Sequence, residues 1–567
     1  MSPPARPPSA PEDPWVGLGL VLVAGAVAVG LVVWVIGQVA GIVFGGGTLS
    51  SGLGEMPGVL TRLPSTLSDP AAAWPVADRR RLPGPIGFYA VTGTAGALLA
   101  AAGLGAARLA RRLPGARGGG RATSGARWAR ARDLRALIVP RSQPGRLTLG
   151  RMGSVLIATE PRASTLVIGP SQSGKTAGLA IPAILEAAGP VLAVSVKRDL
   201  LDHTLAARRA LGDVWIYDPT GAARLEDAGL VGWDPVASCV EWSDARRMAH
   251  NLTSAQGASA GRDAEFWLQM AAKLIAPLLF AASGKVGGSM RDVVGWVDSG
   301  EQRAIEELIL DLGEPDAHAA FLATCRREER TLSSVYATTE AVLGPFSDPA
   351  VLASTGLRQV DPQALLDGQS TLYIVAPGKD QERLAPLFAG LVEHIVDAAY
   401  ARAAEGRACD PSLLLVLDEA ANTAPIRNLP QMAATAAGQG IQVVTVFQDL
   451  AQARSRYGEA ADTILANHRA KLFLSGISDG RTLDYLGRAL GDEDVDYESH
   501  TRGERGSASR TRGTRSKRLA PADAVRGIPP GEAILVYGHL PPARLALRPW
   551  YRDRALRRVN TRGKDAE

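Results

Sequence analysis

Residues 165–176 read Thr-Leu-Val-Ile-Gly-Pro-Ser-Gln-Ser-Gly-Lys-Thr, an apolar run that leads into a glycine-rich loop. The loop has the spacing G-x-x-x-x-G-K-T and precedes a helical segment, which is the arrangement of a phosphate-binding P-loop. Its glycines allow turns that aim backbone N–H groups at phosphate oxygens. The lysine supplies a point charge for the β- and γ-phosphates, and the threonine offers its hydroxyl to Mg²⁺. The predicted ATP-binding residues are Gly169, Pro170, Ser171, Gln172, Ser173, Gly174, Lys175 and Thr176.

A second part of this site is predicted where another apolar run ends. Leu413–Leu417 is followed by Asp418 and Glu419, the pattern of a buried strand that ends in two carboxylates. Beside a P-loop, the first acid would hold the Mg²⁺ shell and the second would orient and partly deprotonate the attacking water. The alternative interpretation is a solvated turn, in which the two acids would have no catalytic or metal-binding role. The run Val443–Phe447 ends in Gln448, whose amide would face the γ-phosphate or the water. The predicted catalytic residues are Glu419, Gln448 and Lys175, and the predicted metal ligands are Thr176 and Asp418.

Around these motifs, short apolar runs alternate with longer amphipathic segments. This alternation is typical of a mostly parallel α/β sheet, whose strands are buried on both faces. The predicted strands are Thr165–Ile168, Val191–Val196, Val214–Tyr217, Thr371–Val375, Leu413–Leu417, Val443–Phe447, Lys471–Ser475 and Ala533–Tyr537.

The composition excludes several other classes of protein. The chain has 567 residues, which is long enough for about two to four domains. Its net charge of +5 comes from 62 basic and 57 acidic residues, so the total charge alone does not indicate nucleic-acid binding. The three cysteines are far apart and lack any CxxC spacing, which excludes a disulfide scaffold and a zinc ribbon. The histidines are scattered singly, so no nuclease or relaxase constellation is present.

The N-terminal region, residues 1–110, is predicted to be a membrane module. No charged residue occurs from Trp15 to Phe44, and Val16–Ile36 alone would span about 31 Å as a helix. A second uncharged stretch, Leu82–Ala107, ends at an arginine cluster. We therefore predict transmembrane helices at about 16–44 and 84–107; a cleavable signal peptide is the alternative for the first.

The arginine cluster sets the expected orientation of this module. By the positive-inside rule, both termini and the basic linker 111–130 would be cytoplasmic, and residues 45–81 would form a short outside loop. Arg79–Arg81 in that loop oppose the rule. We expect the linker to contact anionic lipid headgroups more than DNA.

Together these motifs resemble the type IV coupling protein family, the TraG/TraD-like membrane ATPases of conjugation and type IV secretion. The resemblance covers nearly the whole chain and includes the shorter motifs Val194–Leu200, Tyr217–Pro219 and Trp233–Pro235. It implies an α/β fold, a RecA-like P-loop NTPase core at 131–240 and 346–567, preceded by two transmembrane helices. It also implies an inserted all-α subdomain, and residues 241–345 have helical spacing without a convincing strand.

The function implied by this resemblance is DNA or nucleoprotein recruitment and translocation through a type IV secretion channel, driven by ATP hydrolysis with Mg²⁺. The implied partners are DNA bound without sequence preference, a relaxase-type nucleoprotein, channel components, membrane lipid and further copies of the chain in a homo-hexamer. The implied location is the inner membrane, crossed more than once, with the ATPase domain in the cytoplasm. An FtsK-like chromosome translocase and a protein-secretion ATPase are the alternatives; two helices and one ATPase core favour the coupling protein.

Two segments depart from the family pattern or fall outside it. Some members carry an arginine finger where this chain has Ala436–Gly440, and Arg427, Arg454, Arg456 and Arg469 are the alternatives. The segment Arg502–Arg518 has basic residues among Gly, Ser and Thr and is predicted to be a mobile loop. It would be either a solvated insertion or an arm that contacts phosphates; without aromatic residues it would not stack on bases.

Overall fold

The computed structural model describes residues 14–110, 125–221, 229–254, 256, 262–375, 378–502 and 508–564. They belong to two compact units, Met1–Ala122 and Thr123–Glu567. Most of the predicted basic linker, and part of the segment Arg502–Arg518, lie outside the described residues.

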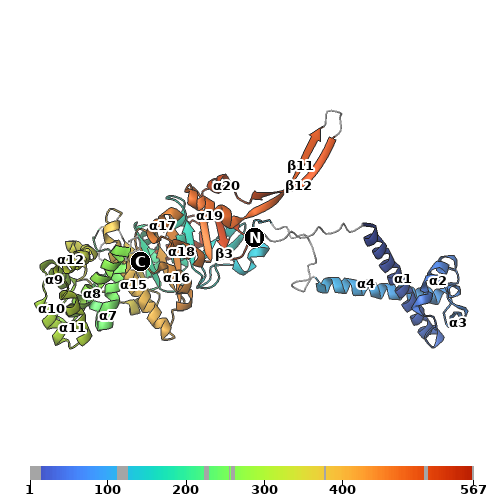
Figure 1. The fold of residues 1–567 in the computed structure, drawn as a ribbon, viewed down its shortest axis with the longest axis horizontal. Helices are drawn as coiled ribbons and strands as arrows, with labels where there is room; N and C mark the ends of the chain where they lie inside the picture. Colours follow the sequence, from blue (N-terminus) through green and yellow to red (C-terminus); the bar gives the residue numbers. More distant parts are fainter. Residues whose placement is uncertain are drawn as a thin grey trace, which may run out of the picture. The chain divides into compact units, whose positions relative to one another are not determined.

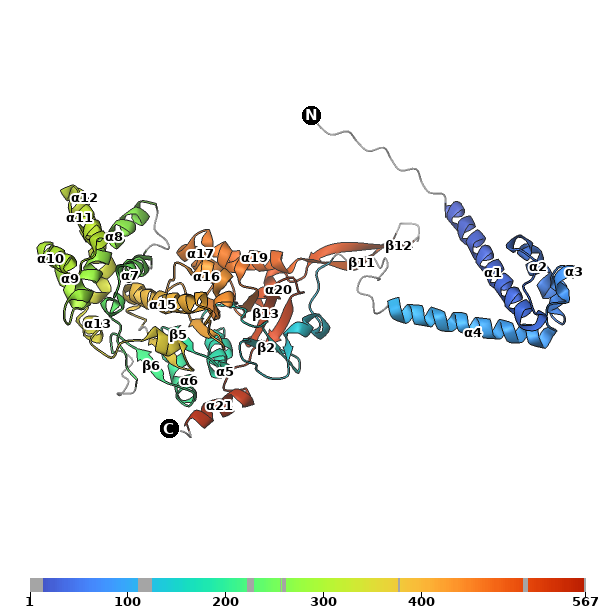
Figure 2. The same cartoon turned by 90° about the horizontal axis from the view of Figure 1, so that it is seen from below.

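The first unit contains two long helices joined by a folded connection. α1 (Pro14–Gly45) contains no charged residue, and α4 (Pro85–Ala110) contains only one, Arg108. The two helices meet at one end, with the short helices of the connection beside that junction (Figure 2). These are η1 (Leu53–Glu55), α2 (Met56–Arg62), η2 (Leu63–Ser65), η3 (Pro70–Ala73) and α3 (Val76–Arg79).

The connection is held together by two buried side chains. Trp74 is fully buried against Gly37 of α1, where a Cβ would come within 3.0 Å of the indole ring. Asp78 accepts hydrogen bonds from the backbone N–H and hydroxyl groups of Ser50 and Ser51. Burial raises the pKa of Asp78, but these hydrogen bonds together hold it below its ordinary value. The segment predicted as a short loop therefore folds as a small structured cap on the helix pair.

Among the described residues, twelve strands of the second unit form one sheet, in the order β1-β3-β2-β14-β13-β10-β4-β9-β8-β5-β7-β6 (Figure 1). The strands from β10 to β6 are parallel, and the β13-to-β1 edge is antiparallel. The bounds are β1 Ile138–Val139, β2 Thr148–Met152, β3 Val155–Ala158, β4 Thr165–Ile168, β5 Val191–Ser195, β6 Val214–Tyr217, β7 Thr371–Val375, β8 Leu413–Leu417, β9 Ile441–Phe447, β10 Ala470–Leu474, β13 Glu532–Tyr537 and β14 Ala543–Ala546.

The predicted mostly parallel α/β sheet is confirmed. Every predicted strand is present within two residues of its expected bounds. Alternate residues of one strand enter two different cores: in β4, Leu166 and Ile168 enter one core and Val167 the other. The central strands are mostly apolar because helices cover both faces of the sheet. The antiparallel edge strands β1, β2, β3 and β14 were not predicted. Arg151 interrupts β2 and Arg544 interrupts β14, while β1 and β3 are apolar but only two and four residues long.

One face of the sheet is covered by helices close to the P-loop and the C-terminus. They are α5 (Ile181–Glu186), α6 (Asp199–Arg209) and α21 (Arg554–Lys564). The other face packs α15 (Gln381–Ala404), α16 (Leu429–Thr435), α17 (Leu450–Tyr457), α18 (Ala460–Asn467) and α19 (Gly480–Leu490), followed along the chain by α20 (Ala522–Arg526).

Between β6 and β7 the chain forms a group of helices. In the described part of 241–345 these helices occur without a strand. They are α7 (Trp242–Ser254), α8 (Arg262–Gly284), α9 (Met290–Ser299), α10 (Arg303–Asp311), α11 (Pro315–Cys325) and α12 (Glu329–Leu343), followed by η8 (Gly344–Ser347), α13 (Pro349–Ser354) and α14 (Pro362–Leu366). Their buried residues belong to the same core as that face of the sheet.

Two helices of this unit are long and apolar enough to cross a membrane by length and composition, among the described residues. They are Asp263–Gly284 of α8 and Gln381–Ala404, which is α15. Their most apolar windows are 67% and 72% buried within the protein, so we assign both to the core.

The prediction of a loop at Arg502–Arg518 is wrong. β12 (Ala508–Arg518) pairs along its whole length with β11 (Asp492–Arg502), and this hairpin projects beyond the sheet (Figure 1). The acidic β11 lies against the basic β12, so that Asp492 is opposite Arg518 and Glu493 opposite Lys517. Such cross-strand pairs of opposite charge stabilise a hairpin that lacks an apolar face. Arg515, in contrast, lies opposite Val495, so only part of the basic charge of β12 faces an acid.

A buried arginine joins α6 to the start of the parallel strands. Arg208 is 0% exposed and donates to Thr371 Oγ1 at 2.7 Å and to the carbonyl oxygens of Ala187, Gly189 and Gln369 at 2.6, 2.9 and 2.7 Å. Replacing it with methionine would leave these acceptors unpaired, at about 1–3 kcal/mol each.

We therefore expect Arg208→Met to lower the thermal unfolding midpoint of the full chain markedly, because several buried acceptors lose their donor together. The adjacent Arg209 is exposed, so Arg209→Met is the matched control and should leave the midpoint nearly unchanged. Scanning calorimetry of both variants in detergent tests this. Equal unfolding midpoints for Arg208→Met and Arg209→Met would show that water can replace the buried guanidinium without loss of stability.

Candidate nucleotide site

Three neighbouring parallel strands bring the predicted site residues to one edge of the sheet. In the register of β4, β9 and β8, Ile168 pairs with Phe447, and Leu417 pairs with Thr445. The strands therefore end together, and their C-terminal continuations are the P-loop, Gln448 and the pair Asp418-Glu419. The backbone N–H of Gly169 donates to Phe447 O at 3.1 Å, which ties the start of the P-loop to the strand that ends in Gln448.

The P-loop owes its shape to two left-handed residues and one steric requirement. Gln172 has φ 64° and Gly174 has φ 90°, and such reversals turn successive N–H groups into one concave surface. A Cβ at position 169 would lie 2.7 Å from Ser173 Oγ and 2.9 Å from Leu474 Cβ, so only glycine fits there. The helical turn η5 (Thr176–Ala180) begins directly after the loop and continues into α5. Of the remaining loop residues, Pro170 is half-buried and Ser171 is exposed.

Lys175 is buried within this loop at 7% exposure. Its Nζ donates to the carbonyl oxygens of Gly169 at 2.6 Å and Pro170 at 2.8 Å. Burial lowers the pKa of the ammonium, and the charges of Asp418 and Glu419 oppose that shift. The side chain is thus held as a cation at the mouth of the loop, close to the acids from β8.

Asp418 connects the P-loop with two neighbouring strands. Its Oδ2 accepts from Thr176 Oγ1 at 3.3 Å and from Ser195 Oγ at 3.3 Å. Burial and the Glu419 carboxylate raise the pKa of Asp418, while Lys175 and the two hydroxyl groups lower it. These hydroxyl and carboxylate oxygens are the kind of ligand that Mg²⁺ takes. No cluster of three His, Cys, Asp or Glu residues suited to a metal occurs among the described residues.

Ser195 was not predicted as a site residue. It ends β5, the strand beside β8, and its hydroxyl reaches the same carboxylate oxygen as Thr176. The signal in the sequence is the one used for Gln448, a polar residue at the end of an apolar parallel strand. At residue 195 that signal was outweighed by the longer apolar run Val191–Val196.

Glu419 lies in a strained backbone conformation. Its φ is 64°, which is unusual for a residue with a side chain, and its carbonyl accepts from the N–H groups of Asn422 and Thr423 at 2.9 and 3.1 Å. The turn swings the chain away immediately after the strand. Asp418, before this turn, is buried, whereas Glu419 is partly exposed.

Gln448 follows β9 and is fixed through its backbone. Its N–H donates to Gln452 Oε1 at 2.9 Å, and Gln452 lies in the first turn of α17. A second hydrogen-bond path leads away from Asp418: Thr423 Oγ1 donates to Asp418 O at 3.3 Å and accepts from Gln381 Nε2 at 3.2 Å. Neither Gln452 nor Gln381 was predicted, since nothing in their local sequence marks them.

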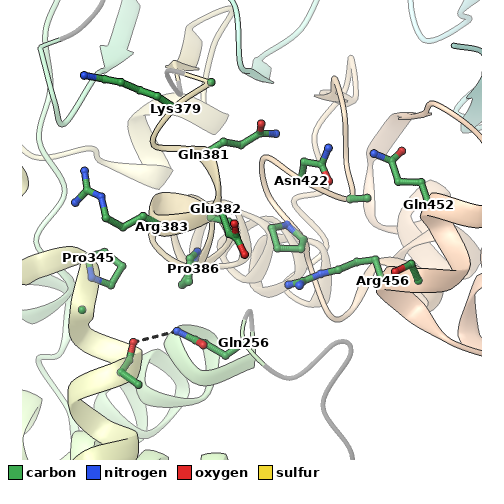
Figure 3. A pocket seen from close by; sticks show the side chains of 17 residues that line it. Gln256, Pro345, Lys379, Gln381, Glu382, Arg383, Pro386, Asn422, Gln452 and Arg456 are labelled. Carbon is green, nitrogen blue, oxygen red and sulfur yellow. Dashed lines mark hydrogen bonds between the residues drawn. The ribbon is translucent and has the colours of Figure 1, made fainter. Parts of the chain in front are cut away.

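Three of the four candidate arginines form ion pairs with acids other than Asp418 and Glu419. Arg427 pairs with Glu265 of α8, Arg454 with Asp462 at 2.8 Å, and Arg469 with Glu160 at 2.9 Å. Arg456 is half-buried on α17 and lines a cavity together with Asn422 and Gln452 (Figure 3). The segment Ala436–Gln439 forms the short helix η9 at the opposite end of β9 from Gln448.

Several known proteins are similar to this chain in sequence. A family model described as "Type IV secretory system Conjugative DNA transfer" matches residues 136–566. Protein VirD4 of Agrobacterium fabrum is 25% identical over 415 residues, covering 70% of this chain and 60% of VirD4. Conjugal transfer protein TraG of Escherichia coli is 26% identical over 318 residues, covering 51% of this chain and 49% of TraG. The chain thus spans less than two thirds of the length of these relatives.

Solved structures of the conjugative coupling protein TrwB share the fold. The unbound form of TrwB lacking its N-terminus superposes with a TM-score of 0.57 at 19% identity, covering 75% of this chain and 92% of that one. TrwB in complex with ADP and Mg²⁺ gives the same TM-score and identity, with 75% and 94% covered. Since the family model covers most of the chain, including the P-loop and the acids after β8, the chain belongs to the type IV secretory system conjugative DNA transfer family.

Proposed function

We propose that this protein is a membrane-anchored P-loop ATPase that couples ATP hydrolysis to the recruitment and translocation of DNA or nucleoprotein through a type IV secretion channel. The observation that carries the proposal is the convergence of Lys175, Thr176, Asp418 and Glu419 at one sheet edge, in a chain of the conjugative DNA transfer family. Two similar proteins support it: TraG is a conjugal transfer protein, and TrwB is a conjugative coupling protein.

Each residue of the site has a role that follows from its position. The P-loop N–H groups, from Gly169 to Thr176, would bind the phosphates, with Lys175 Nζ exchanging its carbonyl partners for phosphate oxygens. Thr176 and Asp418 would hold Mg²⁺, which neutralises charge on the phosphates. Ser195 positions the Asp418 carboxylate from the neighbouring strand.

The remaining two residues act on the water. Glu419, which is partly exposed at the strained turn, would accept a proton from the attacking water. Gln448 is one strand closer to the P-loop and would orient that water or the γ-phosphate through its amide. The bound TrwB structures, with ADP and Mg²⁺ and with a non-hydrolysable ATP analogue, support the same ligands for this site.

We further propose that α1 and α4 cross the inner membrane and that the second unit is cytoplasmic. α1 has 32 residues without charge, about 48 Å of helix, which exceeds the hydrocarbon thickness. The proposed assembly is a homo-hexameric ring, with residues 241–345 as an α-helical subdomain and relaxase-type nucleoprotein and channel components as partners. The cap of residues 46–84 would then lie outside.

The function is tested by ATP turnover of the full chain in nanodiscs, measured against protein density, DNA and salt. We expect turnover to rise with the number of subunits per nanodisc, because a ring site needs a neighbouring subunit, and to rise further with DNA of any sequence. Salt should weaken the DNA effect, since phosphate contacts release counterions. A rate that is indifferent to both protein density and DNA would contradict translocation of DNA and favour a protein cargo.

A further inference from the structure

The hairpin β11–β12, which projects from the sheet, brings an aromatic ring and basic side chains onto one face (Figure 2). Side chains that lie directly opposite each other in an antiparallel pair point to the same face. Val495 is opposite Arg515, and Tyr497 is opposite Gly513. Val495 and Tyr497 are 41% and 49% exposed, and Arg515 and Lys517 are exposed as well. These four side chains form a surface that is called the tyrosine face below.

The ring of Tyr497 lies across the partner strand. A Cβ at Gly513 would come within 2.8–2.9 Å of three ring atoms, Cε1, Cζ and Oη, so glycine is required there for the ring to occupy this place. The three atoms are at nearly equal distances, which shows that the ring leans over the glycine and does not point away from it. One side of the ring therefore covers the backbone of β12, and the other side faces solvent.

A cation lies close to this ring. Arg515 is two residues along β12 from Gly513, about 7 Å at the rise of a strand, and points to the same face. It lies opposite Val495, so it faces no acid across the hairpin. An exposed ring with a guanidinium beside it is the combination that binds a single nucleic-acid strand, since a base stacks on the ring and the cation contacts a phosphate.

The acids of β11 are largely sorted onto the opposite face. Asp492, Asp494 and Asp496 alternate with the residues of the tyrosine face, so their side chains point the other way. The described acid on the tyrosine face is Glu493, which lies opposite Lys517. A polyanion is therefore repelled from one face of the hairpin and can approach the other.

The geometry of the tyrosine face favours a base over other occupants. Attachment to a membrane surface grows with the apolar area that is buried, and Val495 is the only exposed apolar side chain beside Tyr497 on the described part of this face. A protein anchor is usually surrounded by residues that exclude water, whereas Arg515 and Lys517 are exposed. Stacking of an unpaired base needs only the open side of one ring.

We infer that the tyrosine face is a binding site for single-stranded nucleic acid, in which an unpaired base stacks on Tyr497 and a neighbouring phosphate contacts Arg515. The inference rests on the proposed function and adds to it a place where the transported strand is held. The segment Arg502–Arg518 has no aromatic residue of its own; the pairing with β11 supplies the ring.

The first test compares two labelled ligands of equal length, oligothymidylate and an abasic strand with the same phosphates, on full-length protein in phosphatidylcholine nanodiscs. Tyr497→Ile keeps a strand-forming apolar side chain but removes the ring. It should lower the preference for the strand with bases about 5- to 150-fold, the effect of one stacked base, and leave abasic binding unchanged. Tyr497→Phe keeps the ring and should keep the preference.

Tyr551→Ile is the matched control. Tyr551 is 50% exposed, almost the same as Tyr497, and lies between β14 and α21. Its replacement should leave the preference for bases unchanged. If Tyr497 only stabilised the hairpin, Tyr497→Ile would weaken both ligands by the same factor, and the ratio of the two affinities would stay that of the wild type.

The second test measures the cation. Arg515→Gln should reduce the slope of log affinity against log salt by about 0.7 for either ligand, since one phosphate contact on a single strand is lost. Arg291→Gln removes an exposed arginine from α9 and should leave the slope unchanged. An unchanged slope in Arg515→Gln would remove the arginine from the site.

The outcomes separate this site from the proposed function. Wild-type protein that binds neither ligand would refute translocation of DNA. Binding of DNA with a full preference for bases in Tyr497→Ile would refute the tyrosine face alone. If, in that case, phosphatidylglycerol nanodiscs slowed hydrogen exchange of the hairpin and phosphatidylcholine nanodiscs did not, the face would be assigned to lipid headgroups.

Discussion

Lys175→Ala is expected to lower the affinity for ATP by at least about 100-fold, or about 3 kcal/mol. The ammonium is the cation held at the mouth of the P-loop, and its present partners are two carbonyl oxygens that phosphate oxygens can replace. Alanine removes that charge, while Asp418 and Glu419 lose the cation that offsets their repulsion. Titration with a fluorescent ATP analogue measures the change directly.

The control for this variant is Lys285→Ala. Lys285 lies between α8 and α9, pairs with Asp292 and has no contact with the site. Its removal should leave nucleotide affinity unchanged. If Lys175→Ala bound ATP with wild-type affinity, the P-loop would not be the nucleotide site.

Glu419→Gln is expected to retain ATP binding and to lower turnover by about 100- to 10,000-fold, the usual range for loss of a general base. Glutamine has nearly the same shape and can adopt the same left-handed backbone, so the turn after β8 should survive. Only the capacity to accept a proton from water is lost, and that capacity matters only in the transition state. Single-turnover hydrolysis and nucleotide retention should be measured together.

Glu459→Gln, at an exposed acid before α18, is the matched control and should leave turnover unchanged. Fast hydrolysis by Glu419→Gln would show that another group activates the water. Loss of ATP binding in the same variant would show that Glu419 contributes to binding of ATP in the ground state and not only to the transition state.

The sequence was sufficient for the parts of the fold whose signal is local. The strands β4 to β9 are buried and mostly apolar because helices cover both faces of the sheet, and apolar runs of that length are visible without coordinates. The P-loop and the acid pair are likewise defined by spacing. Their convergence depends on the strand order β4-β9-β8, which follows from the expected fold.

Other features had no local signal. The β11–β12 hairpin carries charge on both strands and lacks the apolar alternation that marks a strand, so its stability depends on pairs such as Asp492 with Arg518. Gln381 acquires its role through a contact with the distant Thr423, and Gln452 through a contact with Gln448 that nothing in the local sequence marks, whereas Ser195 shares the signal of a polar residue at the end of an apolar strand. Arg427, Arg454 and Arg469 form ion pairs with Glu265, Asp462 and Glu160, so their position within the chain does not identify an arginine finger.

The left-handed turn at Glu419 has a consequence for directed evolution of this protein. A residue with a side chain costs about 1 kcal/mol or more in that conformation, and glycine relieves the cost. A library screened for heat resistance alone would therefore enrich Glu419→Gly, a variant that survives heating but lacks the carboxylate that we propose as the base. With the proposed role of Glu419, stability and catalysis compete at this single position, so selections on this chain need turnover as a second criterion.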